Sequence, residues 1–290
     1  SRPLALAKTK STGLRMNPDA NRSIAPSALM RSRLANRELM SSMIRREIIG
    51  RYRGSVMGLM WSFFNPVLML SVYTFVFSVV FKARWQGGSD SKTEFALIVF
   101  AGLMMFNLFA ESMNRAPSLI VGNINYVKKV IFPLELLPVI SFCSTVFHSL
   151  VSLLVWLIFF CIFFGLPPLT IVSLPLVVIP LALYALGLSW LLASLGVYIR
   201  DVAQFISILM TALMFLSPVF YPIASLPEQY HLFMNINPLT FVIEQARDVM
   251  IFGRSINWMP WLSQLLLSFL VAWLGFAWFQ KTRKGFADVL

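Results

Sequence analysis

The chain has 290 residues, of which 58% are hydrophobic and only 12% are charged, a balance too apolar for an ordinary soluble domain. Its formal net charge is +12, and residues 1–56 alone hold 12 of the 24 lysines and arginines against three acidic residues. Such a charge could attract nucleic acid, but beside long apolar stretches it fits the anionic face of a membrane better. We therefore expect an all-α polytopic membrane protein that binds membrane lipids and no nucleic acid.

The first part of the chain divides in two. Residues 1–30 mix serine, threonine, asparagine, proline and lysine with scattered apolar residues, which is typical of a flexible basic leader in the cytosol. In residues 31–56, leucine, methionine and isoleucine recur at helical spacing with arginines between them. This pattern predicts a basic amphipathic helix in the cytosolic interface of the membrane, with Gly50 and Gly54 permitting a turn into the first span.

Five stretches of the chain contain no aspartate, glutamate, lysine or arginine. Four exceed the roughly 20 residues that a helix needs to cross the hydrocarbon core. The stretch 136–199 is long enough for two crossings, with a glycine and two prolines near its middle. We therefore predict a six-span domain over residues 57–280 and a short cytosolic tail, 281–290. The predicted spans are residues 57–81, 95–113, 136–164, 174–198, 203–222 and 258–280.

The distribution of positive charge predicts the orientation. With the N-terminus inside, the cytosolic segments hold 19 lysines and arginines and the outer segments hold five. Because cytosolic loops carry the excess of these residues, both termini are expected in the cytosol.

Residues 223–257, between the fifth and sixth predicted spans, are too apolar for a simple loop and too charged for a span. We expect short helices that re-enter the outer leaflet, because irregular backbone at membrane depth is tolerated only against protein or a water-filled cavity.

Sequence motifs for chemistry are missing. The sequence holds no GxxxxGK[ST], HExxH or GxSxG pattern, and Cys143 and Cys161 lie in one apolar span without metal-ligand spacing. His148 is the one titratable group well inside a predicted span; we interpret it as a hydrogen-bonded packing residue, with a proton relay as the alternative. No catalytic or metal-binding residue is expected, and the energy for any transport should come from a partner subunit.

The first and fifth predicted spans combine polar with aromatic side chains. This mixture suits the wall of a conduit for a hydroxyl-rich polymer, and hydrogen bonding between helices is an equal alternative. The candidate lining residues are Trp61, Asn65, Tyr73, Thr211 and Tyr221.

The run from Arg45 to Pro66, RREIIGRYRGSVMGLMWSFFNP, closely resembles the start of the membrane subunits of ABC-2-type polysaccharide exporters. In that family a pattern like RxxxxRYRxSxLGxxWxxxxP recurs, and here Met57 stands where leucine is common. The resemblance covers about residues 35–285, in order. The further matching motifs are VKKVIFPLE at 127–135, RDV at 200–202, SPVFYP at 217–222, NPL at 237–239 and RD at 247–248.

Members of this family are six-span homodimers that bind two copies of a separate ATPase subunit and export lipid-linked glycans. The resemblance implies a permease subunit in the bacterial inner membrane that moves an undecaprenyl-diphosphate-linked polysaccharide, O-antigen being favoured over capsular polysaccharide or teichoic acid. It implies no cofactor in this chain, with ATP and magnesium bound by the ATPase. A membrane enzyme that modifies glycans is the alternative from another class, and it would need a catalytic histidine or carboxylate near a membrane face.

The resemblance also suggests two sets of site residues. The lipid diphosphate is expected at Arg51 and Arg53, because a guanidinium can donate two parallel hydrogen bonds to phosphate; snorkelling to anionic lipid is the alternative. Contacts to the ATPase are expected in the cytosolic loops, with topology signalling as the alternative role of the lysines. The loop residues are Asn123, Lys128, Lys129, Arg200 and Asp201.

Overall fold

The computed structural model describes residues 37–76, 92–128 and 132–290, and these residues form helices and turns with no strand among them. The predicted leader, the start of the predicted amphipathic helix and Lys129 lie outside the described residues. The longer helices are α2 (Arg37–Gly50), α3 (Trp61–Phe75), α4 (Lys92–Arg115), α6 (Leu136–Phe164), α7 (Leu174–Tyr198), α8 (Val202–Leu216), α10 (Pro238–Met250) and α11 (Trp258–Thr282). The short ones are α5 (Ile124–Lys128), α9 (His231–Ile236) and α12 (Phe286–Val289).

Within the described residues, five helical segments are long and apolar enough to cross a membrane, and they contain α3, α4, α6, α7 and α11. Helix α8 is equally apolar but has only 15 residues. The all-α polytopic class is thus confirmed, while the sixth span rests on this shorter helix. The bounds of α6 and α7 coincide with two predicted spans, 136–164 and 174–198.

The predicted fifth span, 203–222, is too long. Helix α8 ends at Leu216, and Ser217 is extended, with φ −97° and ψ 153°. Proline disfavours helical backbone in the residue before it, and Pro218 follows Ser217 directly. Tyr221 therefore lies in a turn beyond the helix, with its hydroxyl donating to the carbonyl of Phe215 at 3.0 Å.

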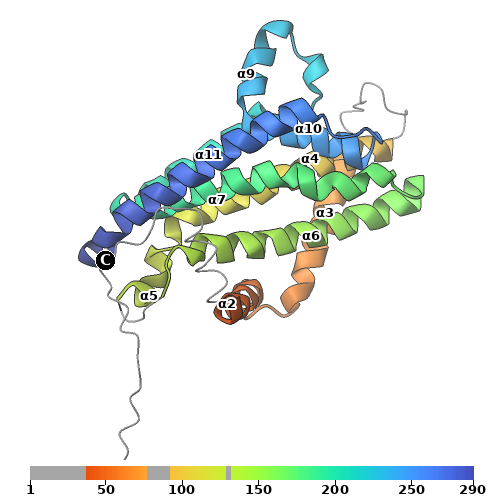
Figure 1. Ribbon diagram of the computed structural model, residues 1–290. Helices are drawn as coiled ribbons and strands as arrows, with labels where there is room; N and C mark the ends of the chain where they lie inside the picture. The colour runs from red at the N-terminus through yellow and green to blue at the C-terminus, as the bar shows by residue number, and fades with distance from the viewer. Residues whose placement is uncertain (1–36, 77–91, 129–131) are drawn as a thin grey trace, which may run out of the picture.

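Helix α4 is the centre of the bundle (Figure 1). Of its most apolar 18 residues 83% are buried, against 17% for α6, and α3, α6, α7, α8 and α10 all pack against it. Yet α4 is less apolar than α6. We explain the central position of α4 by the charged residues at its end, Glu111 and Arg115, which need protein or water around them rather than lipid.

Helices α7 and α11 lie side by side along their length (Figure 1). Two glycines allow this approach: a Cβ on Gly187 would lie 2.7 Å from the Cα of Ala272, and one on Gly275 would overlap the carbonyl of Gly187. Small residues at a membrane helix contact let the backbones come close, so dispersion contacts can replace the hydrophobic effect that lipid does not supply.

Helix α2 is seen almost end-on in Figure 1, so it runs across the long helices rather than along them. Its apolar side contacts protein: Met40 is buried, and Met43 and Ile44 pack beside it against the same core. Leu39 and Ile49 remain exposed. The helix therefore has one side on the bundle and apolar residues left for a membrane surface.

Residues 223–257 contain the short helix α9 and the longer helix α10, and α9 stands away from the bundle in Figure 1. The re-entry of this segment into the outer leaflet stays a prediction. Helix α10 is anchored by Arg247, which is 1% exposed and donates to the carbonyls of Ile98, Pro218 and Val219. Burial lowers the pKa of Arg247 to about 10, so the guanidinium stays protonated at neutral pH. One side chain thus joins α10 to α4 and to the turn after α8.

Candidate functional site

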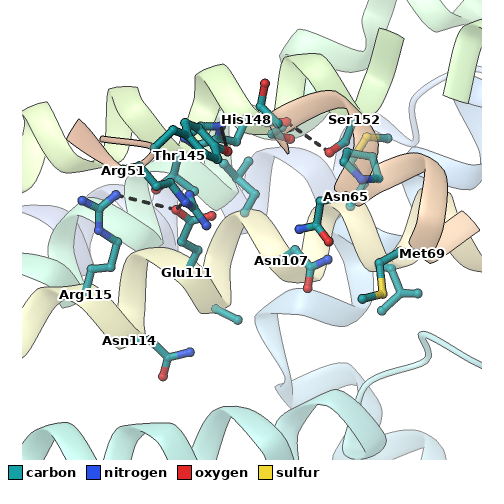
Figure 2. Close-up of a pocket in the computed structure, with 18 of the residues that line it drawn as sticks. Arg51, Asn65, Met69, Asn107, Glu111, Asn114, Arg115, Thr145, His148 and Ser152 are labelled. Carbon is teal, nitrogen blue, oxygen red and sulfur yellow. Dashed lines mark hydrogen bonds and ion pairs between the residues drawn. The ribbon is translucent and has the colours of Figure 1, made fainter. Parts of the chain in front are cut away.

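A cavity of about 970 Å³ lies between the end of α2, the following loop, α3, α4 and α6 (Figure 2). Its walls carry charged, amide and hydroxyl groups, although three of these helices are candidate membrane spans. Polar groups at that depth are costly against lipid, and they are tolerated where they face a water-filled space.

Helix α4 contributes one polar stripe. From Phe95 to Arg115 its only side chains that are not buried are Asn107, Glu111, Asn114 and Arg115, and all four line the cavity. Their spacing of four, three and one places them on one face of a helix. A central helix that is otherwise enclosed therefore opens to solvent along this single stripe.

Helices α3 and α6 also line the cavity with polar side chains. Thr145, His148, Ser149 and Ser152 recur every three or four residues on α6 and line the cavity. Ser62, Asn65 and Tyr73 do so from α3. Several hydroxyls here bond to carbonyls one turn back, as Ser152 does to His148 at 3.1 Å, so these serines and threonines already have a partner.

One end of the cavity is a chain of alternating charges. Arg51 pairs with Glu111, and Arg115 pairs with Glu47 of α2. The Arg115 Nη1 also lies 3.6 Å from the Glu111 carboxylate. All four side chains are partly exposed, between 22% and 41%, so the network is open to an ion from outside. It ties the amphipathic helix and the loop behind it to the end of α4.

His148 lies in the cavity wall and contacts Tyr52. Its Nδ1 lies 3.4 Å from the Tyr52 hydroxyl, and its ring meets the Tyr52 ring edge-on at 5.7 Å. Its Nε2 is buried without a hydrogen-bond partner among the described residues. The ring therefore borders the cavity between the charged end and the hydroxyl-rich part.

The structure brings four of the seven predicted substrate residues together. Arg51, Arg53, Asn65 and Tyr73 all line the cavity. Trp61 does not, and its side chain is exposed on α3 instead. The other two candidates lie outside this cavity, at α8 and the turn that follows it: Thr211, exposed on the helix, and Tyr221, half-buried beyond its end.

The residues predicted to meet an ATPase lie in two loops. Arg200 and Asp201 are exposed in the short turn between α7 and α8. Asn123 is partly buried and donates to the Leu119 carbonyl at 2.8 Å, and Lys128 ends α5. The segment before Asn123 contacts α7 and α8, because a glycine at 196 leaves room for the backbone of Pro117.

Sequence reasoning missed most of the α4 stripe and the acidic half of the charge network. A signal was available: Asn107, Glu111, Asn114 and Arg115 are polar residues on one helical face of an apolar span. The predicted span 95–113 ends between Glu111 and Asn114 and so divides this stripe. The acidic partner of Arg51, Glu111, is distant in sequence, so the sequence alone does not pair the two residues.

Comparison with known proteins identifies the family. The family model described as "ABC-2 type transporter" matches residues 38–251. The chain is 27% identical over 262 residues to an O-antigen export system permease protein RfbA of Myxococcus xanthus, which covers 90% of this chain and 98% of the relative. A protein of the same name from Klebsiella pneumoniae is 25% identical over 87% of this chain and 95% of its own length. The polysialic acid transport protein KpsM of Escherichia coli is 23% identical over 74% of this chain and 81% of its own. With its several apolar helices and this match over most of its length, the chain is a multi-pass membrane protein that belongs to the ABC-2 type transporter family.

Proposed function

We propose that this chain is the permease subunit of an ATP-driven exporter that moves a diphosphate-linked polysaccharide across a bacterial inner membrane. The observation that carries the proposal is the cavity in which Arg51 and Arg53 meet a polar lining formed by α3, α4 and α6. Cations at one end suit a diphosphate, and neutral amides and hydroxyls beyond them suit the sugar that follows it.

O-antigen is the cargo that the relatives favour. The two RfbA proteins match more of this chain, at higher identity, than the KpsM protein does. Capsular polysaccharide is the second candidate, and a strain lacking its own O-antigen or capsule permease distinguishes the two by which surface polymer this chain restores.

The proposal includes a homodimer with two ATPase subunits and both termini in the cytosol. Arg200, Asp201 and the loop through Asn123 to Lys129 would then meet the ATPase. Reversing the charge of Lys128 and Lys129 together should uncouple ATP hydrolysis from export without affecting membrane insertion. Normal export by that variant would remove these lysines from the coupling site.

The headgroup site is tested by paired substitutions. Arg51→Lys with Arg53→Lys keeps the charge but loses the planar fork, so export should fall if phosphate is held by two parallel hydrogen bonds. Arg→Gln at both positions should abolish export. Arg37→Gln, on the part of α2 away from the cavity lining, is the matched control. Full export by the double glutamine variant would place the diphosphate elsewhere.

A further inference from the structure

The amide side chains in the cavity differ from its other polar groups. Among the described residues, no hydrogen bond involves the side chain of Asn65 on α3 or of Asn107 on α4, and both are exposed. Three of the four serine and threonine hydroxyls in the same cavity donate to nearby backbone carbonyls, as Ser62 does to Leu59 at 2.6 Å. The amides therefore have hydrogen-bonding capacity that most of the hydroxyls do not.

Their position fixes what could bind. Asn65 and Asn107 point into the same part of the cavity in Figure 2, beyond the ion pair of Arg51 and Glu111. Asn107 lies one helical turn from Glu111, a rise of about 6 Å. That separation is comparable to one sugar ring, so a group joined directly to an anion at Arg51 would reach Asn107, and Asn65 lies beside Asn107 in Figure 2.

The chemistry of the lining suits a sugar. Each amide offers two donors and an acceptor, and a sugar hydroxyl is itself both donor and acceptor. Met69 and Met104, which also line this cavity, add adaptable apolar surface for the C–H face of a ring. Neither amide carries charge, so this part of the cavity would not compete with Arg51 for phosphate.

We infer that Asn65 and Asn107 form a subsite for the single sugar that is attached to the lipid diphosphate. This inference rests on the proposed function, since it requires the diphosphate to lie at Arg51 and Arg53. It adds that the permease distinguishes a glycosylated lipid diphosphate from a bare one before any polymer enters the conduit. Asn65 and Asn107 would be specificity-determining residues, contacting hydroxyl groups and taking no part in ATP-driven movement.

The test measures binding to the full chain purified in lipid nanodiscs. The probes are a fluorescent polyprenyl diphosphate and the same lipid carrying one glucose, galactose or N-acetylglucosamine. At least one glycosylated probe should bind about tenfold more tightly than the bare diphosphate, the effect of one or two net hydrogen bonds. Asn65→Ala with Asn107→Ala should remove that difference and leave the Kd of the bare diphosphate unchanged. Asn235→Ala, on exposed α9 outside the cavity, should behave like the unaltered protein.

Each other outcome overturns a different claim. If the unaltered protein binds bare and glycosylated probes equally, the sugar subsite is wrong and the headgroup site stands. If it binds neither, the headgroup site is wrong and the proposed function loses its support. If the double variant loses both probes alike, the amides hold the diphosphate or the local fold, and the sugar assignment fails.

Discussion

The charge of Arg51 is already balanced within the protein, because its guanidinium forms an ion pair with the carboxylate of Glu111. Exposed ion pairs of this kind contribute little to stability, because solvent screens them. A diphosphate carries more charge than one carboxylate and can accept both hydrogen bonds of the guanidinium fork. In our proposal Glu111 is therefore a resident counter-ion, which the diphosphate displaces from Arg51.

Replacing Glu111 with glutamine should make anion binding stronger. Without the carboxylate, Arg51 and Arg115 lose a competing partner, and the affinity for inorganic pyrophosphate should rise by roughly three- to tenfold at low salt. Isothermal titration of the purified chain measures this, with Glu38→Gln on the exposed side of α2 as the control. An unchanged affinity would mean that pyrophosphate binds away from this ion pair.

Arg247 should be among the most sensitive positions in the chain. Arg247→Met removes the donor that three backbone carbonyls share, and leaving buried carbonyls unpaired should cost about 3 kcal/mol. Thermal unfolding in detergent measures the loss. Arg254, whose side chain is 72% exposed and paired with Asp248, provides the comparison, since Arg254→Met should change the melting temperature little. Equal effects of the two variants would contradict a structural role for Arg247.

Among the elements, those bounded by charges or turns could be predicted from sequence. Helices α6 and α7 begin and end where the apolar stretches are cut by Glu135, by the glycine and prolines around 166, and by Arg200. Within the predicted span 203–222 no charged residue marks the end of the helix, because α8 ends before Pro218 inside an uncharged stretch. The local backbone preference of a residue before proline prevailed there over continuous apolarity.

The cavity could be predicted only in part, for a different physical reason. Arg51 and Arg53 were found because they lie in one short motif, and Asn65 because it is polar in an apolar span. Residues on α4 and α6 join them only through tertiary packing, since the rotation of each helix about its axis decides which stripe faces the cavity. Trp61 and Tyr73 show the same limit: both lie on α3, and only Tyr73 lines the cavity.

The contact between α7 and α11 should tolerate no added methyl group at its closest point. Gly275→Ala would place a Cβ against the backbone carbonyl of Gly187. A backbone carbonyl cannot change rotamer to relieve the overlap, so the two helices must separate. We expect a lower melting temperature and less monodisperse protein after extraction. Gly122→Ala is the matched control, because a Cβ there meets nothing within 4 Å. A Gly275→Ala protein as stable as the Gly122→Ala protein would show that the two helices can slide apart freely.

At the scale of the whole molecule, α3 and α8 present exposed apolar faces away from the shared core. Phe63 and Phe64 on α3 are exposed, as are Phe205, Ile208 and Phe215 on α8. Such faces suit lipid or a second copy of the chain. We extend the proposed homodimer to a conduit enclosed between the two copies, which assigns these faces to the second copy and places Thr211 toward the shared axis.

Cysteine labelling tests that arrangement in a background without Cys143 and Cys161. Asn65→Cys should react with a water-soluble thiol reagent in the resting protein, because the cavity it lines is polar. Thr211→Cys should react only during ATP turnover, when a conduit between two copies holds water. Leu154→Cys, exposed on α6 and facing lipid in this arrangement, is the unreactive control. Labelling of Thr211→Cys equal to that of Leu154→Cys would exclude α8 from the conduit.

The enclosed position of α4 also constrains how the chain is made. Its polar stripe enters the bilayer before α6 has left the ribosome. Glu111 and Arg115 then already have their ion-pair partners Arg51 and Glu47, but α3 is the one neighbouring span that has been made. The insertion machinery must therefore retain α4, rather than release it to lipid, until Thr145 and His148 arrive to complete the polar surroundings. Nascent chains arrested after α4 should remain attached to the translocon, and chains arrested after α6 should pass into lipid.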